Sequence, residues 1–307
     1  MGTMNRSTIS IRQLMLVIVV CITSATSVNA QSGNSGNVRQ KQTNTMGNIR
    51  KSGYAPINGL QMYYEIYGEG TIPLVLVHGG GSTIETSFGR LLPLFSSHRK
   101  VIALELQAHG RTSDRDAPES FEQDADDVAA LVKYLNVDKA DFLGFSSGAI
   151  ATLQIVIRHP DIVNKIISIS GSDKRDGFVS GFFDVFQHVT LADLPEALKM
   201  AYLKVAPDKS HLQIMFEKDV ARMANFKDIS DDAIKSIKAP SLIMITDRDI
   251  VTPEHAASMM RLIPGARLII LPGVHGECLG AADVSPANST PSLPAITVGL
   301  VEDFLNK

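Results

Sequence analysis

The chain has 307 residues, of which 44% are hydrophobic and 20% are charged. This composition predicts one large globular domain with a sizeable buried core, and it excludes the disordered and fibrous classes of protein. The formal net charge is −3 and no run of Lys and Arg forms a basic stripe, so nucleic acid and anionic membrane surfaces are not expected partners, and a neutral small molecule fits better.

The first thirty residues have the pattern of a secretory signal peptide. Arg6 and Arg12 precede an apolar run at 14–22, and small polar residues follow as far as Ala30. The run is shorter than the roughly 20 residues of a membrane span, so cleavage after Ala30 is the favoured interpretation and an uncleaved anchor is the alternative. A lipid anchor on Cys21 is disfavoured, because two bulky valines precede that cysteine.

Cleavage would leave a periplasmic or secreted protein with a single cysteine, Cys278, and therefore with no intramolecular disulfide. It would also leave 27 basic against 32 acidic residues, a net charge of −5. Residues 31–50 are rich in Gly, Asn, Ser and Gln and are predicted to be a flexible linker, so the folded domain, 51–307, is expected to start near Tyr54. No stable membrane partner is expected after cleavage, and the sequence defines no oligomeric state.

From there, short apolar strands alternate with helices. Strands are expected at 59–67, 72–78, 101–104, 142–144, 166–169, 241–246 and 267–271. An amphipathic helix is expected at 121–135, where a solvated face carrying Asp124, Asp126 and Asp127 is favoured over a metal site. Short buried strands separated by helices imply an α/β fold, with a mostly parallel sheet covered by helices on both faces.

The segment at 172–238 interrupts this alternation. It contains predicted helices at 194–205, 211–226 and 231–237, and an aromatic cluster of Phe178, Phe182, Phe183 and Phe186. The economical placement for such a segment is an inserted helical cap over the carboxyl ends of the strands. Core packing is favoured over substrate contact for the aromatic side chains.

A G-x-S-x-G motif marks the centre of the predicted site, between an apolar strand and an apolar helix. Gly144 and Gly148 lie two residues before and after Ser146, where a sharp strand-to-helix turn would crowd side chains. Ser146 is therefore the candidate nucleophile, and Ser147 is disfavoured because Phe145 occupies one of its own flanking positions. The N–H of Ser147, at the start of the helix, is a candidate oxyanion donor. An ordinary Gly/Ser turn is the alternative.

Further motifs follow three other strands, and ligands of open α/β sheets bind at the carboxyl ends of strands. A His-Gly-Gly-Gly run ends the strand at 72–78 and offers the N–H groups of Gly79 and Gly80 to a developing oxyanion. A Thr-Asp-Arg-Asp run at 246–249 offers an acid, and His275 follows the last strand. Nucleophile, acid and base thus occur in that order.

A serine hydroxyl becomes nucleophilic when a base removes its proton, and a carboxylate must hold the base in the right tautomer. His275 fits the role of base. The other histidines fit it less well. His109 precedes the serine, and His78 is expected to shape its own loop. The rest occupy helices or loops away from strand ends or, for the last, a predicted helix only six residues after the acid: His98, His159, His188, His211 and His255. Asp249 is favoured as the acid over Asp247, which directly follows the strand and can spend its carboxylate on N–H groups of its own turn.

In combination, these motifs resemble the α/β-hydrolase family over residues 54–307. The His-Gly-Gly-Gly run resembles the family's oxyanion motif, the G-x-S-x-G run its nucleophile elbow, and the loops of Asp249 and His275 its acid and base loops. The sequence departs from the family at Glu105, where relatives carry Asp, and at Ala108, where they carry Gly. A Pro/Ser-rich insertion at 283–293 is a second departure, interpreted as either a pocket rim or a plain surface loop.

The resemblance implies a serine hydrolase that cleaves an ester or related acyl bond of a small, partly apolar substrate, and the leader pattern at 1–30 adds the expectation that it is exported. The implied site consists of the triad Ser146, Asp249 and His275 and the oxyanion donors Gly79, Gly80 and Ser147. Carbon–carbon bond or lactone hydrolysis by the same triad is one alternative, and a non-catalytic binding protein on the same fold is another. No metal or cofactor is expected, since the sequence lacks H-E-x-x-H, C-x-x-C, P-loop and G-x-G-x-x-G patterns.

Overall fold

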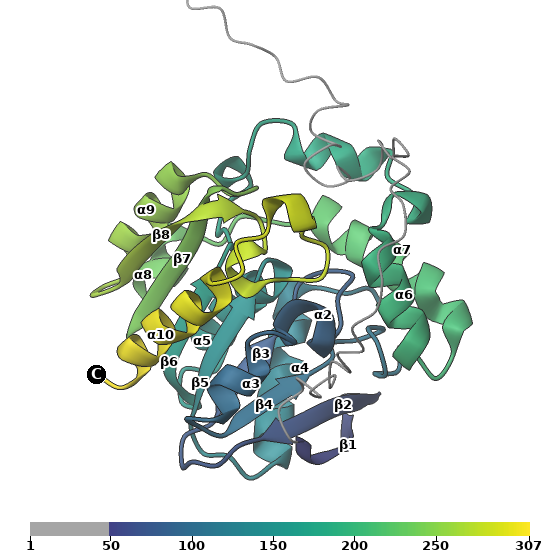
Figure 1. The fold of residues 1–307 in the computed structure, drawn as a ribbon, viewed down its shortest axis with the longest axis horizontal. Helices are drawn as coiled ribbons and strands as arrows, with labels where there is room; N and C mark the ends of the chain where they lie inside the picture. Colours follow the sequence, from purple (N-terminus) through teal and green to yellow (C-terminus); the bar gives the residue numbers. More distant parts are fainter. Residues whose placement is uncertain (1–48) are drawn as a thin grey trace, which may run out of the picture.

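A computed structural model describes residues 49–307, so the predicted signal peptide and most of the predicted linker lie outside the described residues. A sheet of eight strands lies at its centre, in the order β1-β2-β4-β3-β5-β6-β7-β8 (Figure 1). The strands are β1 (Ile49–Ile57), β2 (Leu60–Tyr67), β3 (Leu74–Val77), β4 (Val101–Leu104), β5 (Ala140–Phe145), β6 (Val163–Ile169), β7 (Ser241–Arg248) and β8 (Arg267–Val274). Strands β3 to β8 are parallel, and β2 is antiparallel to both β1 and β4. The predicted mostly parallel sheet is confirmed.

The described residues begin with β1 at Ile49, ahead of Tyr54, and β1 is an edge strand that the sequence pattern did not reveal. Only Ala55 and Ile57 of β1 are buried, so the hydrophobic alternation on which strand prediction relies is nearly absent. Backbone pairing with β2 holds the strand in place, and Tyr54 packs edge-to-face on Tyr63 with ring centroids 5.3 Å apart.

Helices cover both faces of the sheet. One face carries α4 (Phe121–Tyr134), α5 (Ser147–Arg158), α8 (Asp231–Lys235) and α9 (Pro253–Leu262), and the other carries α2 (Ile84–Phe88), α3 (Leu92–Ser96) and α10 (Leu293–Leu305). Alternate residues of β3 serve the two cores, with Val75 and Val77 in one and Leu74 and Leu76 in the other. Burial on both faces explains why the inner strands are continuously apolar. Among residues 49–307, none of the helices combines the length and apolarity needed to cross a membrane.

The segment between β6 and β7 forms a helical cap, as Figure 1 shows for α6 (Glu196–Val205) and α7 (Leu212–Ala224). Short 3-10 helices accompany them: η1 (Arg175–Gly177), η2 (Phe182–Gln187), η3 (Leu191–Asp193) and η4 (Lys209–His211). The third predicted helix, α8, packs against α5 and α9 and so belongs to the body of the domain. Phe178 and Phe182 stack with centroids 4.5 Å apart within the main core, which confirms that this pair serves packing.

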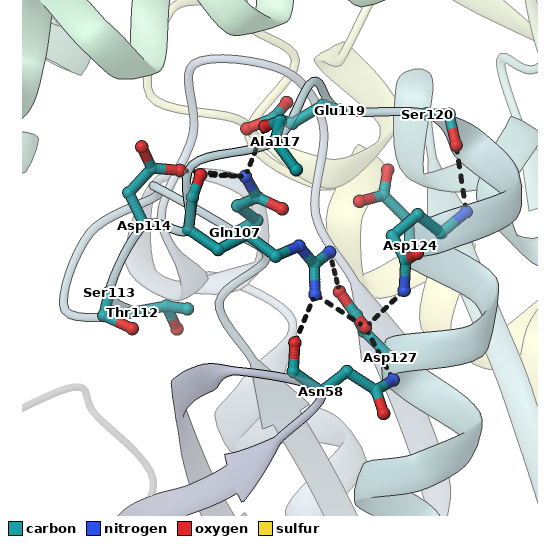
Figure 2. Close-up of polar contacts among 12 residues, drawn as sticks. Asn58, Gln107, Thr112, Ser113, Asp114, Ala117, Glu119, Ser120, Asp124 and Asp127 are labelled. Carbon is teal, nitrogen blue, oxygen red and sulfur yellow. Dashed lines mark hydrogen bonds and ion pairs between the residues drawn. The ribbon is translucent and has the colours of Figure 1, made fainter.

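The prediction of a solvated acidic face on α4 is wrong for two of its three acids. Asp127 is 1% exposed and accepts hydrogen bonds from Asn58 Nδ2 at 2.8 Å and from both terminal nitrogens of Arg115, as Figure 2 shows around Asn58 and Asp127. Asp126 remains on the surface, where it pairs with Arg158. Amphipathic periodicity marks the apolar stripe of a helix, but it does not show which acids are buried beside a distant cation.

The third acid, Asp124, lies in a buried charged cluster between α4 and the cap. Arg222 of α7 donates hydrogen bonds to Asp124 and Asp219, and its Nη1 lies 3.6 Å from Glu119 Oε2. The side chains of Arg222, Asp124 and Glu119 are at most 2% exposed. Arg222 therefore joins the cap to the body through ion pairs that are shielded from solvent.

Replacing Arg222 by alanine should destabilise the protein strongly, because it leaves carboxylates buried without their cation. Breaking one side of a buried ion pair costs about 3–5 kcal/mol. Urea unfolding of the variant measures this loss. Arg158→Ala is the matched control, since Arg158 and Asp126 are 39% and 31% exposed and surface pairs contribute about 1 kcal/mol or less. Equal losses in the two variants would contradict this account of the cap.

Candidate active site

Ser146 lies at the turn between β5 and α5 in a conformation that non-glycine residues rarely adopt. Its φ is +55° and its ψ is −122°, and such strained residues persist only where the surrounding structure holds them. The N–H of Ser146 donates to Ile169 O at 2.9 Å, and its carbonyl accepts from Ala149 N at 2.9 Å. The strand and the helix thus fix the serine from both sides.

The two glycines that flank Ser146 are required by backbone crowding. A Cβ on Gly144 would lie 2.1 Å from Gly148 O, and a Cβ on Gly148 would lie 2.3 Å from Val77 O. Both distances are too short for non-bonded atoms. The prediction that these glycines relieve crowding at the turn is confirmed.

Ser146, His275 and Asp249 lie together at the carboxyl edge of the sheet. His275 Nε2 is 3.1 Å from Ser146 Oγ, and His275 Nδ1 is 2.6 Å from Asp249 Oδ1. The three side chains come from the ends of β5, β8 and β7, which meet at one edge because these strands are parallel. The ring of Phe145 stacks on His275 with centroids 4.9 Å apart and thereby supports the imidazole.

Asp249, and not Asp247, reaches His275. The buried carboxylate of Asp249 also accepts from Ser170 Oγ at 2.6 Å and from Thr246 Oγ1 at 2.8 Å. Asp247 Oδ1 instead accepts from the N–H of Gly273 at 2.8 Å, in the neighbouring strand and not in its own turn. Asp247 therefore ties β7 to β8, while Asp249 is oriented toward the imidazole.

The His-Gly-Gly-Gly run is shaped by its own histidine. His78 Nδ1 donates to Gly79 O at 2.7 Å, and His78 Nε2 accepts from Leu106 N at 3.0 Å. Burial lowers the pKa of His78 to about 3, so the ring is neutral, as these two hydrogen bonds require. The prediction that His78 shapes its loop is confirmed.

The three candidate oxyanion donors differ in their hydrogen bonding. The N–H of Gly79 points to Ser87 Oγ at 3.4 Å. The N–H groups of Gly80 and Ser147 have no acceptor within residues 49–307. A Cβ on Gly80 would lie 3.6 Å from Ser147 Oγ, so the two residues are neighbours. This geometry favours Gly80 and Ser147 as the pair of donors next to Ser146.

Comparison with known proteins identifies the family. The model of the alpha/beta hydrolase family matches residues 74–279, which is more than half of the chain. The chain belongs to the α/β hydrolase family. Serine hydrolase BPHL of Homo sapiens is 28% identical over 242 residues, which cover 74% of this hydrolase and 81% of the relative.

Solved structures show the same fold. The enol-lactonase from Burkholderia xenovorans LB400 has a TM-score of 0.66 at 20% identity and covers 83% of this hydrolase and 100% of its own chain. The meta-cleavage product hydrolase from Pseudomonas fluorescens IP01 has a TM-score of 0.68 at 20% identity, with 84% and 98% covered. The predicted α/β-hydrolase fold is confirmed, and the matches place this chain among hydrolytic enzymes.

The Pro/Ser-rich insertion of this hydrolase is attached to the loop that carries His275. Glu277 is buried; its Oε2 accepts from Val274 N at 3.0 Å, and its Oε1 accepts from Thr290 N at 3.0 Å and from Thr290 Oγ1 at 2.7 Å. A Cβ on Gly276, the residue that follows His275, would lie 3.4 Å from Val284 Cγ2 of the same insertion. The insertion thus contributes to the surroundings of the imidazole, which favours the interpretation as a rim over a plain surface loop.

Sequence reasoning did not find the buried cluster next to the oxyanion loop. His109 Nε2 lies 2.9 Å from Asp219 Oδ2, a contact that spans 110 positions of the chain. His109, Glu119 and Asp219 offer donor atoms within 4.8 Å of one another, a spacing that could hold a metal ion. Arg222 already pairs with both carboxylates and supplies the positive charge there, so we assign no metal to this cluster.

His275 and Asp249 shift each other's pKa. Burial alone would lower the pKa of His275, but the Asp249 carboxylate outweighs burial and raises it above the usual 6.5. Burial alone would raise the pKa of Asp249, but His275 and the hydroxyl donors hold it below its usual range. The pair therefore favours an ionised carboxylate that accepts from the Nδ1–H of the imidazole.

We expect an NMR pH titration of His275 to give a pKa above 6.5 in the unmodified hydrolase. Asp249→Asn should lower that pKa, because the amide removes the charge that stabilises the imidazolium. Asp247→Asn is the matched control and should leave the pKa of His275 in place, since Asp247 bonds to Gly273. A larger shift in the Asp247 variant would show that the carboxylates have been assigned in the wrong order.

Proposed function

We propose that this α/β hydrolase is an exported serine hydrolase that cleaves an ester or related acyl bond of a small, partly apolar substrate. The observation that carries the proposal is the continuous contact from Ser146 Oγ through His275 to Asp249, at 3.1 Å and 2.6 Å. Such a chain couples a hydroxyl to a base and the base to an orienting carboxylate, which is the arrangement that acyl transfer requires.

In the acylation step, Ser146 Oγ attacks the carbonyl carbon of the substrate while His275 Nε2 takes the hydroxyl proton. The carbonyl oxygen becomes an oxyanion that accepts from the N–H groups of Gly80 and Ser147, with Gly79 shaping the loop beside them. The tetrahedral intermediate collapses, the bond to the leaving group breaks, and His275 gives its proton to the leaving oxygen.

Deacylation repeats these steps with water. His275 takes a proton from the water as its oxygen attacks the acyl carbon, and the new oxyanion occupies the same donors. Collapse then releases the acid and returns the proton to Ser146 Oγ. Asp249 remains ionised throughout and keeps Nδ1–H of His275 directed away from the serine.

The complete contact chain supports an enzyme over a non-catalytic binding protein. A binding protein has no need of a strained nucleophile position together with a buried acid and a base at hydrogen-bond distance. A lactone is a cyclic ester and would follow the same acyl-enzyme route, whereas carbon–carbon bond cleavage would give a carbon leaving group in place of an alkoxide. Ester substrates of graded length therefore test the main proposal directly.

The purified protein should hydrolyse nitrophenyl esters, with a preference among acyl chain lengths, and Ser146→Ala should reduce turnover by about 10³-fold or more while leaving the melting temperature unchanged. Turnover by the Ser146 variant within about tenfold of the unmodified enzyme would overturn the assignment of the nucleophile.

Asp249→Asn should lower turnover by about 10⁴-fold, as the equivalent change does in serine proteases, because the imidazole then adopts the wrong tautomer.

Export rests on the pattern of residues 1–30, which lie outside the described residues. Within the described chain, Cys278 is buried, and burial raises the pKa of its thiol to about 12. A protonated, inaccessible thiol reacts slowly with oxidants and disulfides, so this single cysteine is compatible with an oxidising compartment.

Export predicts a mature protein that begins at Gln31, because the small residues before it place cleavage after Ala30. N-terminal sequencing of the protein recovered from the envelope or the medium of a bacterial host measures this. Recovery of an intact Met1 in the membrane fraction would show that the leader is an anchor.

A further inference from the structure

The cap touches the oxyanion loop, residues 79–81, through one carboxylate. Asp219 lies on α7, and its Oδ2 accepts a hydrogen bond from the N–H of Gly81, a contact that spans 138 positions of the chain. A Cβ on Gly80 would lie 3.2 Å from the same oxygen. Asp219 therefore lies beside the two residues that form the end of this loop.

The oxyanion loop needs an anchor at this end. Three consecutive glycines impose little conformational preference of their own, and Gly81 adopts a φ of +63°. The other end of the loop is held by His78, which donates to Gly79 O, and by Ser87, which accepts from the N–H of Gly79. At the Gly81 end, Ser82 Oγ donates to Gly80 O at 3.3 Å, and Asp219 is the side chain from the cap that bonds to the backbone.

His109 holds Asp219 and carries a positive charge. Its Nδ1 is 2.7 Å from Gln107 O and its Nε2 is 2.9 Å from Asp219 Oδ2. A carbonyl and a carboxylate oxygen both accept hydrogen bonds, so each ring nitrogen must carry a proton and the ring is an imidazolium. The ring is fully buried and lies 4.8 Å, centroid to centroid, from the neutral ring of His78.

The carboxylate of Asp219 is electrostatically compensated. A lone carboxylate beside an oxyanion would oppose the charge that develops in the transition state. Here His109 contacts Oδ2, and Arg222, which Asp219 shares with Asp124, contacts Oδ1, so each oxygen of Asp219 has a cation beside it. Asp219 can therefore hold the loop without repelling the oxyanion.

We propose that Asp219 and His109 are positioning residues for the oxyanion hole, so that the correct geometry of Gly80 depends on a contact from the cap helix α7. This inference rests on the serine-hydrolase function proposed above. Neither residue touches the reacting atoms; both act through the backbone of the loop.

Asp219→Asn is the central variant, because it keeps the shape of the side chain and removes its charge. Glu217→Gln is the matched control, since Glu217 lies on the exposed side of the same helix and bonds to Gln213. With the preferred nitrophenyl ester, Asp219→Asn should lower kcat and kcat/KM together by roughly 10–100-fold, with little change in KM, as expected when an interaction made only in the transition state is weakened. The Glu217 variant should match the unmodified enzyme.

The inhibition constant of a trifluoromethyl ketone distinguishes a positioning role from a merely structural one. The ketone forms a hemiketal with Ser146 whose oxyanion occupies the same donors as the substrate. Its inhibition constant should rise in Asp219→Asn by about the factor lost from kcat/KM. An equal inhibition constant in the Asp219 and Glu217 variants would overturn the proposal.

The pH profile tests His109. The groups facing it are Asp219 and Arg222 of α7, Glu119, Asp124 of α4 and the ring of His78. Burial would lower the pKa of His109, but the Asp219 carboxylate raises it to about 9, so the imidazolium persists at neutral pH and is lost as the pH rises through about 9. In the unmodified enzyme, kcat should therefore fall as the pH rises through about 9, which gives the pH profile an alkaline limb. Asp219→Asn should move this limb to lower pH.

His109→Gln should show a reduced kcat without the alkaline limb, since no titrating ring remains. A His109 variant with unchanged kcat and an unchanged limb would count against the proposal. Backbone amide exchange of Gly81, whose N–H bonds to Asp219, provides a test without substrate, and this amide should exchange at least about tenfold faster in Asp219→Asn than in Glu217→Gln. If the unmodified protein hydrolyses no ester, the proposed function fails, while equal amide exchange in the two variants means that the positioning role fails.

Discussion

The site depends on the close approach of helix α5 to the end of strand β3. Gly148, in the first turn of α5, lies against the carbonyls of Val77 and His78, and any Cβ there would come within 2.3 Å of both. This contact brings the N-terminus of α5, and with it Ser147, next to the glycines that follow β3. It also forces Ser146 into its strained turn, because β5 must reverse into the helix without moving away from β3. The strain is one that the flanking strand and helix can support, since strained residues cost only about 1–3 kcal/mol each.

The sequence was sufficient to predict features that depend on local pattern. The G-x-S-x-G turn, the His-Gly-Gly-Gly run and the loops of Asp249 and His275 each follow an apolar strand, and parallel strands bring their carboxyl ends together at one edge. Local pattern did not reveal β1, whose first residues are exposed and, after Ile49, polar, or the burial of Asp124 and Asp127. It also could not pair Asp219 with Gly81 and His109, because the partners are more than a hundred positions apart and neither periodicity nor propensity encodes such contacts.

Two imidazoles near the site have different electrostatic surroundings and therefore different uses. His275 is partly exposed and contacts one carboxylate through Nδ1, which leaves Nε2 free to exchange a proton with Ser146. His109 is fully buried with an acceptor at each nitrogen, so its protons are held in place. A base must change its protonation state during each turnover, whereas an anchor must not. The same side chain thus serves proton transfer in one place and fixed charge in the other, according to the number of acceptors around it.

The buried charged cluster around Arg222 fixes the position of α7 and contributes little to the net stability of the fold. Replacing a buried ion pair by well-packed apolar residues is often neutral or even stabilising, because desolvation offsets the attraction between the charges. Stability alone therefore gives little reason to bury Arg222, Asp124, Asp219 and His109 between the cap and the body. Apolar contacts are non-directional and tolerate small shifts of a helix, whereas hydrogen-bonded charges fix both distance and orientation. Because one of these charges also bonds to Gly81, the cluster sets the position of α7 relative to the oxyanion loop, a geometry that a purely apolar interface would specify less tightly.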